Sequence, residues 1–229
     1  MMIEYGLPKS QIVSQSNYSP WFADPEFHAA FQKAGPLTAV DHLRCYELWQ
    51  LTEQAAVIEG DILEVGAWRG GTAILFGLAS KRFLATRPVH VCDTFEGIVK
   101  AGVNDPFYKG GEFSDTSLDF VQSRMSEFDL GHVQLYKGIF PDDTAHLLRD
   151  KIFSLVHIDV DVYQSAKETF YWAWDRLSVG GVVVFDDYGW VDCAGVIKFV
   201  NEELRARHDC ITLHNLNGHA VIIKTRLQG

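Results

Sequence analysis

Four aspartates follow two apolar, β-branched segments of the sequence. Asp159 and Asp161 lie in HIDVDVY, and Asp186 and Asp187 lie in FDDYG. Residues two apart on a strand project from one face, and neighbouring parallel strands end at the same edge of a sheet. Four unpaired carboxylates there would repel one another, and a hard cation relieves that repulsion. Oxygen ligands favour Mg²⁺, Mn²⁺ or Ca²⁺ over zinc, so we expect a divalent-metal site, with helix capping and salt bridging as the alternative.

A glycine-rich turn follows an earlier apolar segment. In EVGAWRGGT, Gly66, Gly70 and Gly71 allow a tight turn and a close approach of the backbone to a ligand. Their spacing differs from the G-x-G-x-x-G of dinucleotide-binding proteins. Glu64, just before the turn, suits a cationic ligand group better than a pyrophosphate. A plain strand-to-helix turn is the alternative interpretation.

Asp93 ends the next apolar segment, in VCDTF. Nucleotide-binding folds place an acidic residue here to accept hydrogen bonds from ribose hydroxyls, although a solvated strand end is also possible. Together, Glu64 and Asp93 indicate an adenosine-bearing ligand that has no phosphate at the first turn. S-adenosylmethionine fits that description.

Other residues near these motifs are more ambiguous. His157 would face the same side as Asp159 on a regular strand, either supporting the metal ligands or satisfied within the core. Tyr163, Tyr188 and Trp190 flank the aspartates and either wall a substrate pocket or pack. Residues 97–114 are glycine-rich and unpatterned, which predicts either a lid over the site or a disordered connector.

Strands alternate with helices along the chain, which predicts an α/β fold with a parallel sheet covered on both faces. Two final strands, expected around an Asn217–Gly218 turn, would add an antiparallel hairpin, as is typical of S-adenosylmethionine methyltransferases. The expected fold is thus a Rossmann-like, seven-stranded, mostly parallel sheet. The expected strands are 61–66, 88–95, 133–138, 154–161, 181–187, 210–216 and 219–224, and the expected helices are 38–58 (capped by Asp41), 72–80, 116–128, 142–150, 164–177 and 194–207.

Length and composition limit the remaining possibilities. The 229 residues fit one domain over 37–229, preceded by an irregular arm over 1–36 that covers the site or contacts a second copy in a dimer. A net charge of -10 disfavours nucleic acid as a partner, and no apolar run is long enough to span a membrane. The N-terminus lacks the pattern of a secretory signal, and the four cysteines have no metal or disulfide spacing. We expect a cytoplasmic protein.

From about residue 60 to residue 224, the sequence resembles the macrocin-type O-methyltransferases, which methylate sugar or related hydroxyls in antibiotic biosynthesis. The resemblance rests on GDILEVGAWRGGT, VCDTFEG, LYKGIFPDD, HIDVDVYQSAKET and RLSVGGVVVFDDYG. It implies a Rossmann-like fold, S-adenosylmethionine as cofactor, Mg²⁺ and a small-molecule hydroxyl acceptor. The chain is short for this family, and the segment before residue 60, which would shape the acceptor pocket, is only loosely similar to it.

The resemblance also assigns roles to individual residues. It implies that Asp161 is the general base for the acceptor hydroxyl, and that the metal ligands are Asp159, Asp186 and Asp187. The residues implied to bind the cofactor are Glu64, Gly66, Arg69, Gly70 and Gly71 at the methionine end, Asp93, Thr94 and Phe95 at the ribose, and Gly138 and Phe140 at the adenine.

Other functions are compatible with parts of this pattern. In a glycosyltransferase of the DxD type, Asp159 and Asp161 would hold Mn²⁺ on a nucleotide sugar, but no basic cluster suited to a diphosphate lies near the glycine turn. A binding module without catalysis would not need all four aspartates, and a dehydrogenase would need the phosphate fingerprint. A metal-dependent O-methyltransferase is therefore the leading hypothesis.

Overall fold

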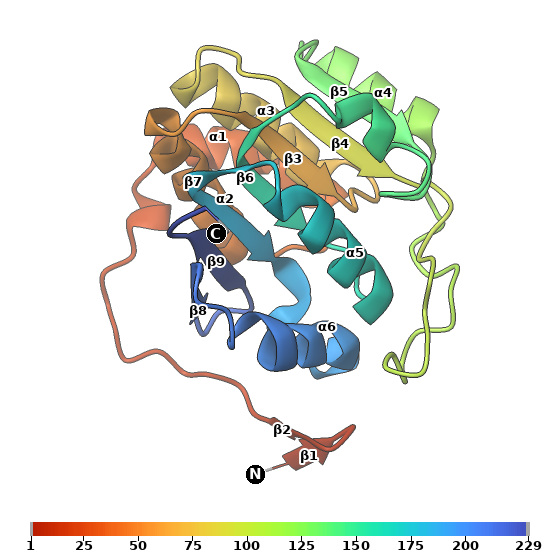
Figure 1. Cartoon of the computed structure of the whole chain (residues 1–229). Helices are drawn as coiled ribbons and strands as arrows, with labels where there is room; N and C mark the ends of the chain where they lie inside the picture. Colours follow the sequence, from red (N-terminus) through yellow and green to blue (C-terminus); the bar gives the residue numbers. More distant parts are fainter. Residues whose placement is uncertain (1, 228–229) are drawn as a thin grey trace.

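A seven-stranded sheet forms the centre of the computed structural model, which describes residues 2–227 (Figure 1). The strand order is β5-β4-β3-β6-β7-β9-β8. Only β9 runs against its neighbours, β7 and β8. This architecture confirms the expected Rossmann-like fold with its antiparallel C-terminal hairpin. The strands of the sheet are β3 (Asp61–Val65), β4 (Val89–Asp93), β5 (Val133–Lys137), β6 (Phe153–Ile158), β7 (Leu177–Phe185), β8 (Cys210–His214) and β9 (Ala220–Lys224).

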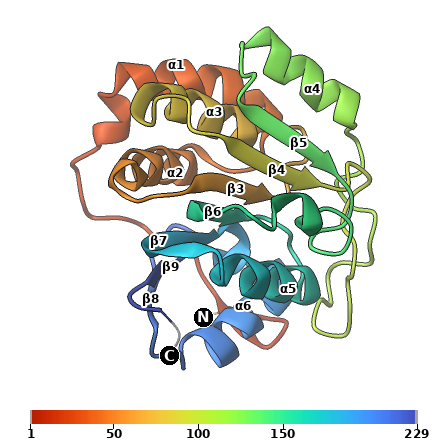
Figure 2. The ribbon, with the colours of Figure 1, turned by 45° about the horizontal axis from the view of Figure 1, so that its top comes forward.

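Helices cover both faces of the sheet, as Figure 2 shows. One face packs against the first three helices and the other against α5 and α6, while α4 lies beside β5 at the edge. The helices are α1 (Pro25–Ala34), α2 (His42–Gln54), α3 (Gly71–Phe83), α4 (Leu118–Glu127), α5 (Tyr163–Trp174) and α6 (Ala194–Phe199), which continues as a π-helix over Val200–Leu204.

Alternation along the central strands divides the core into two layers. In β3, Ile62 belongs to the layer under α2 and α3, whereas Leu63 and Val65 belong to the layer under α5 and α6. All three side chains are buried, because a parallel sheet inside an α/β fold has no solvent-facing side.

The expectation of an irregular chain over residues 1–36 is wrong for residues 25–34, which form α1 and pack on α3. The Asp24 carboxylate caps this helix by accepting hydrogen bonds from the backbone N–H groups of Glu26 and Phe27. Pro25 stands at the first helical position, where its missing N–H costs nothing. Asp41 caps α2 in the same way, as expected.

The part of the chain before α1 lies apart from the sheet. Strands β1 (Met2–Glu4) and β2 (Leu7–Lys9) form a separate antiparallel pair, and residues 10–18 are exposed (Figure 1). The division of the chain at residue 36 into an arm and a separate domain remains a prediction.

Other element boundaries also differ from expectation, and the helix expected over 38–58 covers only His42–Gln54. Residues 142–150 contain only a short 3-10 turn, Ala145–Leu148, because the Asp143 carboxylate instead accepts the backbone N–H of Ile139 in a local loop. Strand β7 begins at Leu177 rather than 181, since an irregularity in its pairing with β6 accommodates Ser178 and the two glycines. No helix among residues 2–227 is long and apolar enough to cross a membrane.

Candidate active site

A cavity of about 330 Å³ opens at the carboxyl ends of β3, β4, β6 and β7. This is the edge of an open α/β sheet where ligands bind. Most of the predicted site residues that face it come from the turns after these strands. Those lining the cavity are Gly66, Asp93, Thr94, Gly138, Phe140, Asp159, Asp161, Asp186 and Asp187.

Gly66 sets the shape of the turn after β3. Its φ is 90°, and a Cβ placed on it would lie 1.7 Å from the backbone oxygen of Asp159. Only glycine fits there, so the turn and the Asp159 backbone are in direct contact. The turn is also held by the Asp93 carboxylate, which accepts the backbone N–H groups of Ala67 and Trp68 at 2.6 and 2.9 Å.

The Asp93 carboxylate accepts more hydrogen bonds from the protein itself than the sequence indicated. Its other oxygen accepts the backbone N–H of Phe95 at 2.5 Å. The carboxylate therefore fixes the turns after both β3 and β4 while one side of it faces the cavity.

Five of the predicted cofactor contacts do not line the cavity. Glu64 is fully buried, with one oxygen 3.2 Å from Nδ1 of His157, and Arg69 pairs with Asp115 on the surface side of the turn. Phe95 is buried in the core, and Gly70 and Gly71 pack against α4 and the segment before α2. These five residues therefore lie outside the cavity lining, a difference that a loop pattern in the sequence does not reveal.

The four aspartates converge, although not for the reason that their spacing suggested. Strand β6 ends at Ile158, and Asp161 has φ 62°, so strand alternation does not align Asp159 with Asp161. Instead, Oδ2 of Asp187 accepts the backbone N–H groups of Val160 and Asp161, at 3.2 and 2.7 Å. One oxygen each of Asp159, Asp186 and Asp187 then lies within 4.8 Å of the others.

Asp161 is held by a residue of the long loop. The Tyr108 hydroxyl donates to its Oδ1 at 2.6 Å, and the Cys193 sulfur lies 3.7 Å from the same oxygen. Burial and the charge of Asp161 raise the pKa of Tyr108, so the hydroxyl keeps its proton and acts as donor. Within residues 2–227, no group donates a hydrogen bond to the second oxygen of Asp161.

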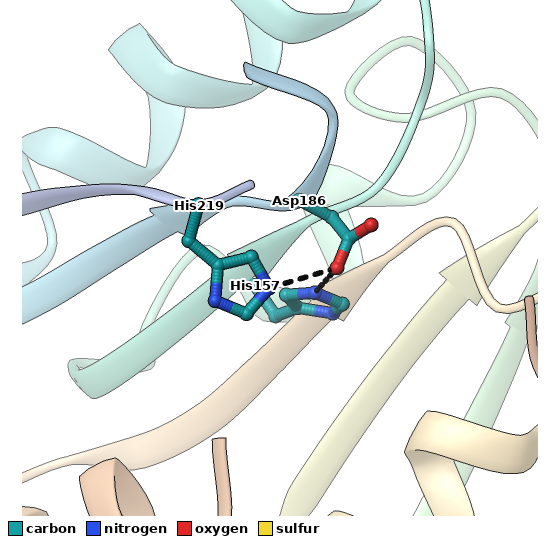
Figure 3. Close-up of side chains that lie close together, drawn as sticks. All are labelled: His157, Asp186 and His219. Carbon is teal, nitrogen blue, oxygen red and sulfur yellow. Dashed lines mark hydrogen bonds and ion pairs between the residues drawn. The ribbon is translucent and has the colours of Figure 1, made fainter. Parts of the chain in front are cut away.

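Asp186 has cationic or donor groups on both oxygens. Its Oδ2 pairs with the Arg44 guanidinium, and its Oδ1 lies 2.9 Å from Nε2 of His219 and 3.5 Å from Nε2 of His157 (Figure 3). Burial disfavours its charge, but the contacts with His157 and His219 and the charge of Arg44 outweigh burial and hold its pKa below the usual range.

The other three carboxylates have pKa values shifted the opposite way. Burial, then the charge of Asp186, raises the pKa of Asp159; burial and Asp187 raise that of Asp161. Burial with the charges of Asp159 and Asp186 raises the pKa of Asp187. The contacts with Asp186 and Glu64 outweigh burial at His157 and raise its pKa to about 10.

This donor set fits a divalent cation. No side chain or backbone group among residues 2–227 donates a hydrogen bond to the Asp159 carboxylate, which faces the cavity beside two further carboxylates. A half-buried carboxylate without a hydrogen-bond donor is costly, and a cation bound by all three carboxylates would offset both that cost and their mutual repulsion. Hard oxygen ligands match Mg²⁺ or Mn²⁺.

Several residues at the site were not identified from the sequence. Four of them contact one of the aspartates directly: Arg44, Tyr108, Cys193 and His219. The fifth, Glu47, contacts His219. The chain separation is 142 residues for Arg44 and Asp186, and 172 for Glu47 and His219. No local pattern signals contacts of that range.

Comparison with known proteins places the chain among methyltransferases. The model of the Macrocin-O-methyltransferase (TylF) family matches residues 35–222. The chain belongs to the macrocin O-methyltransferase family. This confirms the resemblance expected from the sequence motifs and favours a methyltransferase over a DxD glycosyltransferase.

Individual relatives agree with this family. Mycinamicin III 3''-O-methyltransferase of Micromonospora griseorubida is 30% identical over 163 residues, which are 66% of this chain and 62% of the relative. Demethyldecarbamoylnovobiocin O-methyltransferase of Streptomyces niveus is 29% identical over 57% of this chain and 53% of that protein. The chain thus spans less than two thirds of the length of these curated relatives.

Solved structures support the fold of the family. The O-methyltransferase NovP superposes with a TM-score of 0.66 at 25% identity, covering 83% of each chain. The calicheamicin methyltransferase CalS11 gives the same TM-score at 16% identity, over 92% of this chain and 99% of that chain. At 16% identity, the likeness to CalS11 shows a shared fold alone.

Proposed function

We propose that this chain is an S-adenosylmethionine- and divalent-metal-dependent O-methyltransferase that methylates a hydroxyl of a small-molecule natural product, such as a sugar substituent. The observation that supports it most is the convergence of Asp159, Asp186 and Asp187 on the cavity of a chain from this family. The relatives named for mycinamicin and demethyldecarbamoylnovobiocin suggest the class of acceptor.

The cofactor would occupy the half of the cavity formed by the turns after β3, β4 and β5. We propose direct contacts for Gly66, Asp93 and Thr94 on one side, and for Gly138 and Phe140 on the adenine side, because all five line the cavity. For the predicted contacts outside the lining we propose that they shape the turn. These are Glu64, Arg69, Gly70, Gly71 and Phe95.

The cation would be held by Asp159, Asp186 and Asp187. It would lie in the same part of the cavity as the acceptor. A bound divalent cation supplies Lewis acidity, which lowers the pKa of a nearby hydroxyl. Asp161 would accept the acceptor's proton at Oδ2, since Oδ1 is occupied by the Tyr108 hydroxyl. Such proton transfer typically contributes ~10²–10⁴-fold to the rate.

The long loop would exclude water from this reaction. It brings Tyr108 and Phe113 to the cavity wall and is closed on itself by backbone hydrogen bonds between Ile98 and both Gly111 and Glu112. With the loop in place, acceptor and methyl donor would be held in line, and orientation of reactants can lower a barrier by ~7–11 kcal/mol.

Binding calorimetry tests the cofactor assignment first. We expect S-adenosylhomocysteine to bind and a panel of nucleotide sugars not to bind, because the glycine turn presents no basic cluster for a diphosphate. Binding of a nucleotide sugar with no binding of S-adenosylhomocysteine would replace this proposal by the glycosyltransferase.

Substitution of the aspartates tests the metal and the base. We expect Asp159→Asn to weaken Mn²⁺ binding at least about tenfold and to abolish metal-dependent transfer of a labelled methyl group to glycosylated acceptors, with S-adenosylhomocysteine binding unchanged. Asp161→Asn should instead lower kcat by ~10²–10⁴-fold with the metal still bound. Asp119→Asn is the matched control, since Asp119 is exposed on α4 and lies outside both the cavity lining and the three carboxylates. Full activity of Asp159→Asn in EDTA would exclude the metal role.

Three further assignments belong to this proposal. We infer a cytoplasmic enzyme without nucleic-acid or membrane partners, and a homodimer in which the segment before α1 contacts the second copy. Light scattering of the full chain, compared with a chain lacking residues 1–19, tests the dimer.

A further inference from the structure

His219 bridges two carboxylates that come from different parts of the fold. Its Nε2 lies 2.9 Å from Oδ1 of Asp186, and its Nδ1 contacts Oε2 of Glu47 on α2. The imidazole is fully buried. Since carboxylates accept hydrogen bonds, the ring donates from both nitrogens and keeps none free to bind a metal itself.

The turn between β8 and β9 fixes the backbone of His219. The Asn215 side-chain oxygen accepts the backbone N–H groups of Asn217 and His219, at 2.8 and 3.1 Å. The Asn215 amide nitrogen donates to the same Glu47 oxygen that His219 contacts. His219 therefore has its backbone and its ring held by one connected set of hydrogen bonds.

This turn is also joined directly to the segment that contains the aspartates. The backbone N–H of Gly189 donates to the carbonyl of Gly218 at 2.6 Å, two residues after Asp187. A Cβ on Gly189 would lie 2.3 Å from the Cα of Gly218, so the two backbones are in close contact. The C-terminal hairpin and the end of β7 thus form one unit.

We propose that His219, oriented by Glu47 and the C-terminal hairpin, is a positioning residue that holds Asp186 in the orientation in which it binds the divalent cation. The inference rests on the metal dependence proposed above. One oxygen each of Asp159, Asp186 and Asp187 lies within 4.8 Å of the others, so the three carboxylates repel one another. The hydrogen bond from His219 opposes rotation of the Asp186 carboxylate away from this arrangement, and Figure 3 shows that contact. Partners that orient metal ligands typically change metal affinity 10–100-fold when they are removed.

The test measures Mn²⁺ affinity by calorimetry, without any acceptor. We expect His219→Leu to raise the dissociation constant about 10–100-fold, because the leucine cannot donate to Asp186. His219→Gln retains an N–H donor and should restore the constant to within about threefold of the wild type. His208→Leu is the matched control, since His208 is exposed and lies outside the cluster.

S-adenosylhomocysteine affinity, measured on the same samples, reports whether each variant is folded. His219→Leu should bind it like the wild type, because the hairpin does not line that part of the cavity. If His219→Leu does not fold, the inference is judged on His219→Gln and on Glu47→Ala, which removes only the orienting carboxylate. We expect Glu47→Ala to weaken Mn²⁺ binding about tenfold.

Two outcomes would overturn the positioning role. The first is unchanged Mn²⁺ affinity in folded His219→Leu or, if that variant is unfolded, in Glu47→Ala. The second is tight Zn²⁺ binding that both His157→Leu and His219→Leu remove while Mn²⁺ binding persists, since the histidines would then be ligands. Failure of the wild type to bind Mn²⁺ at all, or binding that Asp159→Asn leaves intact, would instead contradict the proposed function.

Discussion

Gly66 shows how a single residue type determines the geometry of the site. Its left-handed backbone and its contact with the Asp159 carbonyl both exclude a side chain. The sequence identified this glycine as part of a ligand-binding turn, and the structure adds that the turn touches the segment bearing the aspartates. A change here should therefore affect both the turn after β3 and the segment that carries Asp159.

We predict that Gly66→Ala lowers the free energy of unfolding by about 3 kcal/mol or more. The left-handed conformation costs an alanine about 1–2 kcal/mol, and the Cβ clash with the Asp159 carbonyl adds to it. Urea unfolding measures the change. Gly111→Ala has the same φ of 90° with nothing within 4 Å, so it should show the conformational cost alone.

Gly131 serves as a further control, because its φ is not positive and an added Cβ would have no atom within 4 Å. Gly131→Ala should lie within about 0.5 kcal/mol of the wild type or be slightly stabilising. Equal losses at Gly66 and Gly111 would show that the Asp159 carbonyl moves aside and that the close contact has no energetic role.

At the scale of elements, the loop over residues 97–114 depends on Asp105. This side chain is buried, and its Oδ1 accepts the backbone N–H of Tyr163 at 2.8 Å, at the start of α5. The N-cap residue of α5, Val162, has no side chain that caps the helix, so the loop supplies the cap. Oδ2 of Asp105 accepts the backbone N–H of Gly102, which folds the loop around the same carboxylate.

We predict that Asp105→Ala destabilises the protein by about 1–2 kcal/mol, the usual cost of losing a helix cap. The loop should also become more susceptible to limited proteolysis within residues 97–114. Asn104→Ala is the control, because the Asn104 side chain makes its only hydrogen bond within residues 2–227 by accepting from the exposed Lys198. A variant with normal stability and unchanged cleavage would contradict the role of Asp105 as both cap and anchor.

For the whole molecule, half-buried histidines determine part of the pH dependence of stability. Burial lowers the pKa of His132 from 6.5, although its hydrogen bond to the Gly77 carbonyl opposes the shift. The unfolded chain then binds a proton at a higher pH than the folded one, so this contribution is present above pH 6.5 and is lost as the pH falls through and below that value.

We therefore expect His132→Gln to reduce the acid sensitivity of the protein. The difference in unfolding free energy between wild type and variant should shift against the wild type as the pH decreases from 7.5 to 5. Urea unfolding at several pH values in this window measures it, and the subtraction removes all other titrating groups. A difference that is constant, or that shifts in favour of the wild type, would show that protonation of His132 does not destabilise the folded protein.

The sequence determined the order of strands and helices, because burial on both faces requires apolar strands and turns require glycine and polar residues. It also determined that aspartates stand after β6 and β7, and so that they meet at one edge of the sheet. Helix α1 was missed although Asp24 and Pro25 mark its start, since its apolar positions stand among prolines and polar residues.

Only the tertiary structure decided which groups surround those aspartates. Arg44 on α2, Tyr108 in the loop and His219 in the hairpin reach the cluster from elements far apart in sequence. Spacing along a chain predicts which residues share a strand or a helix face, but contacts between elements depend on packing angles and side-chain rotamers. The partner of each carboxylate, and with it the sign of its pKa shift, is therefore a property of the folded molecule.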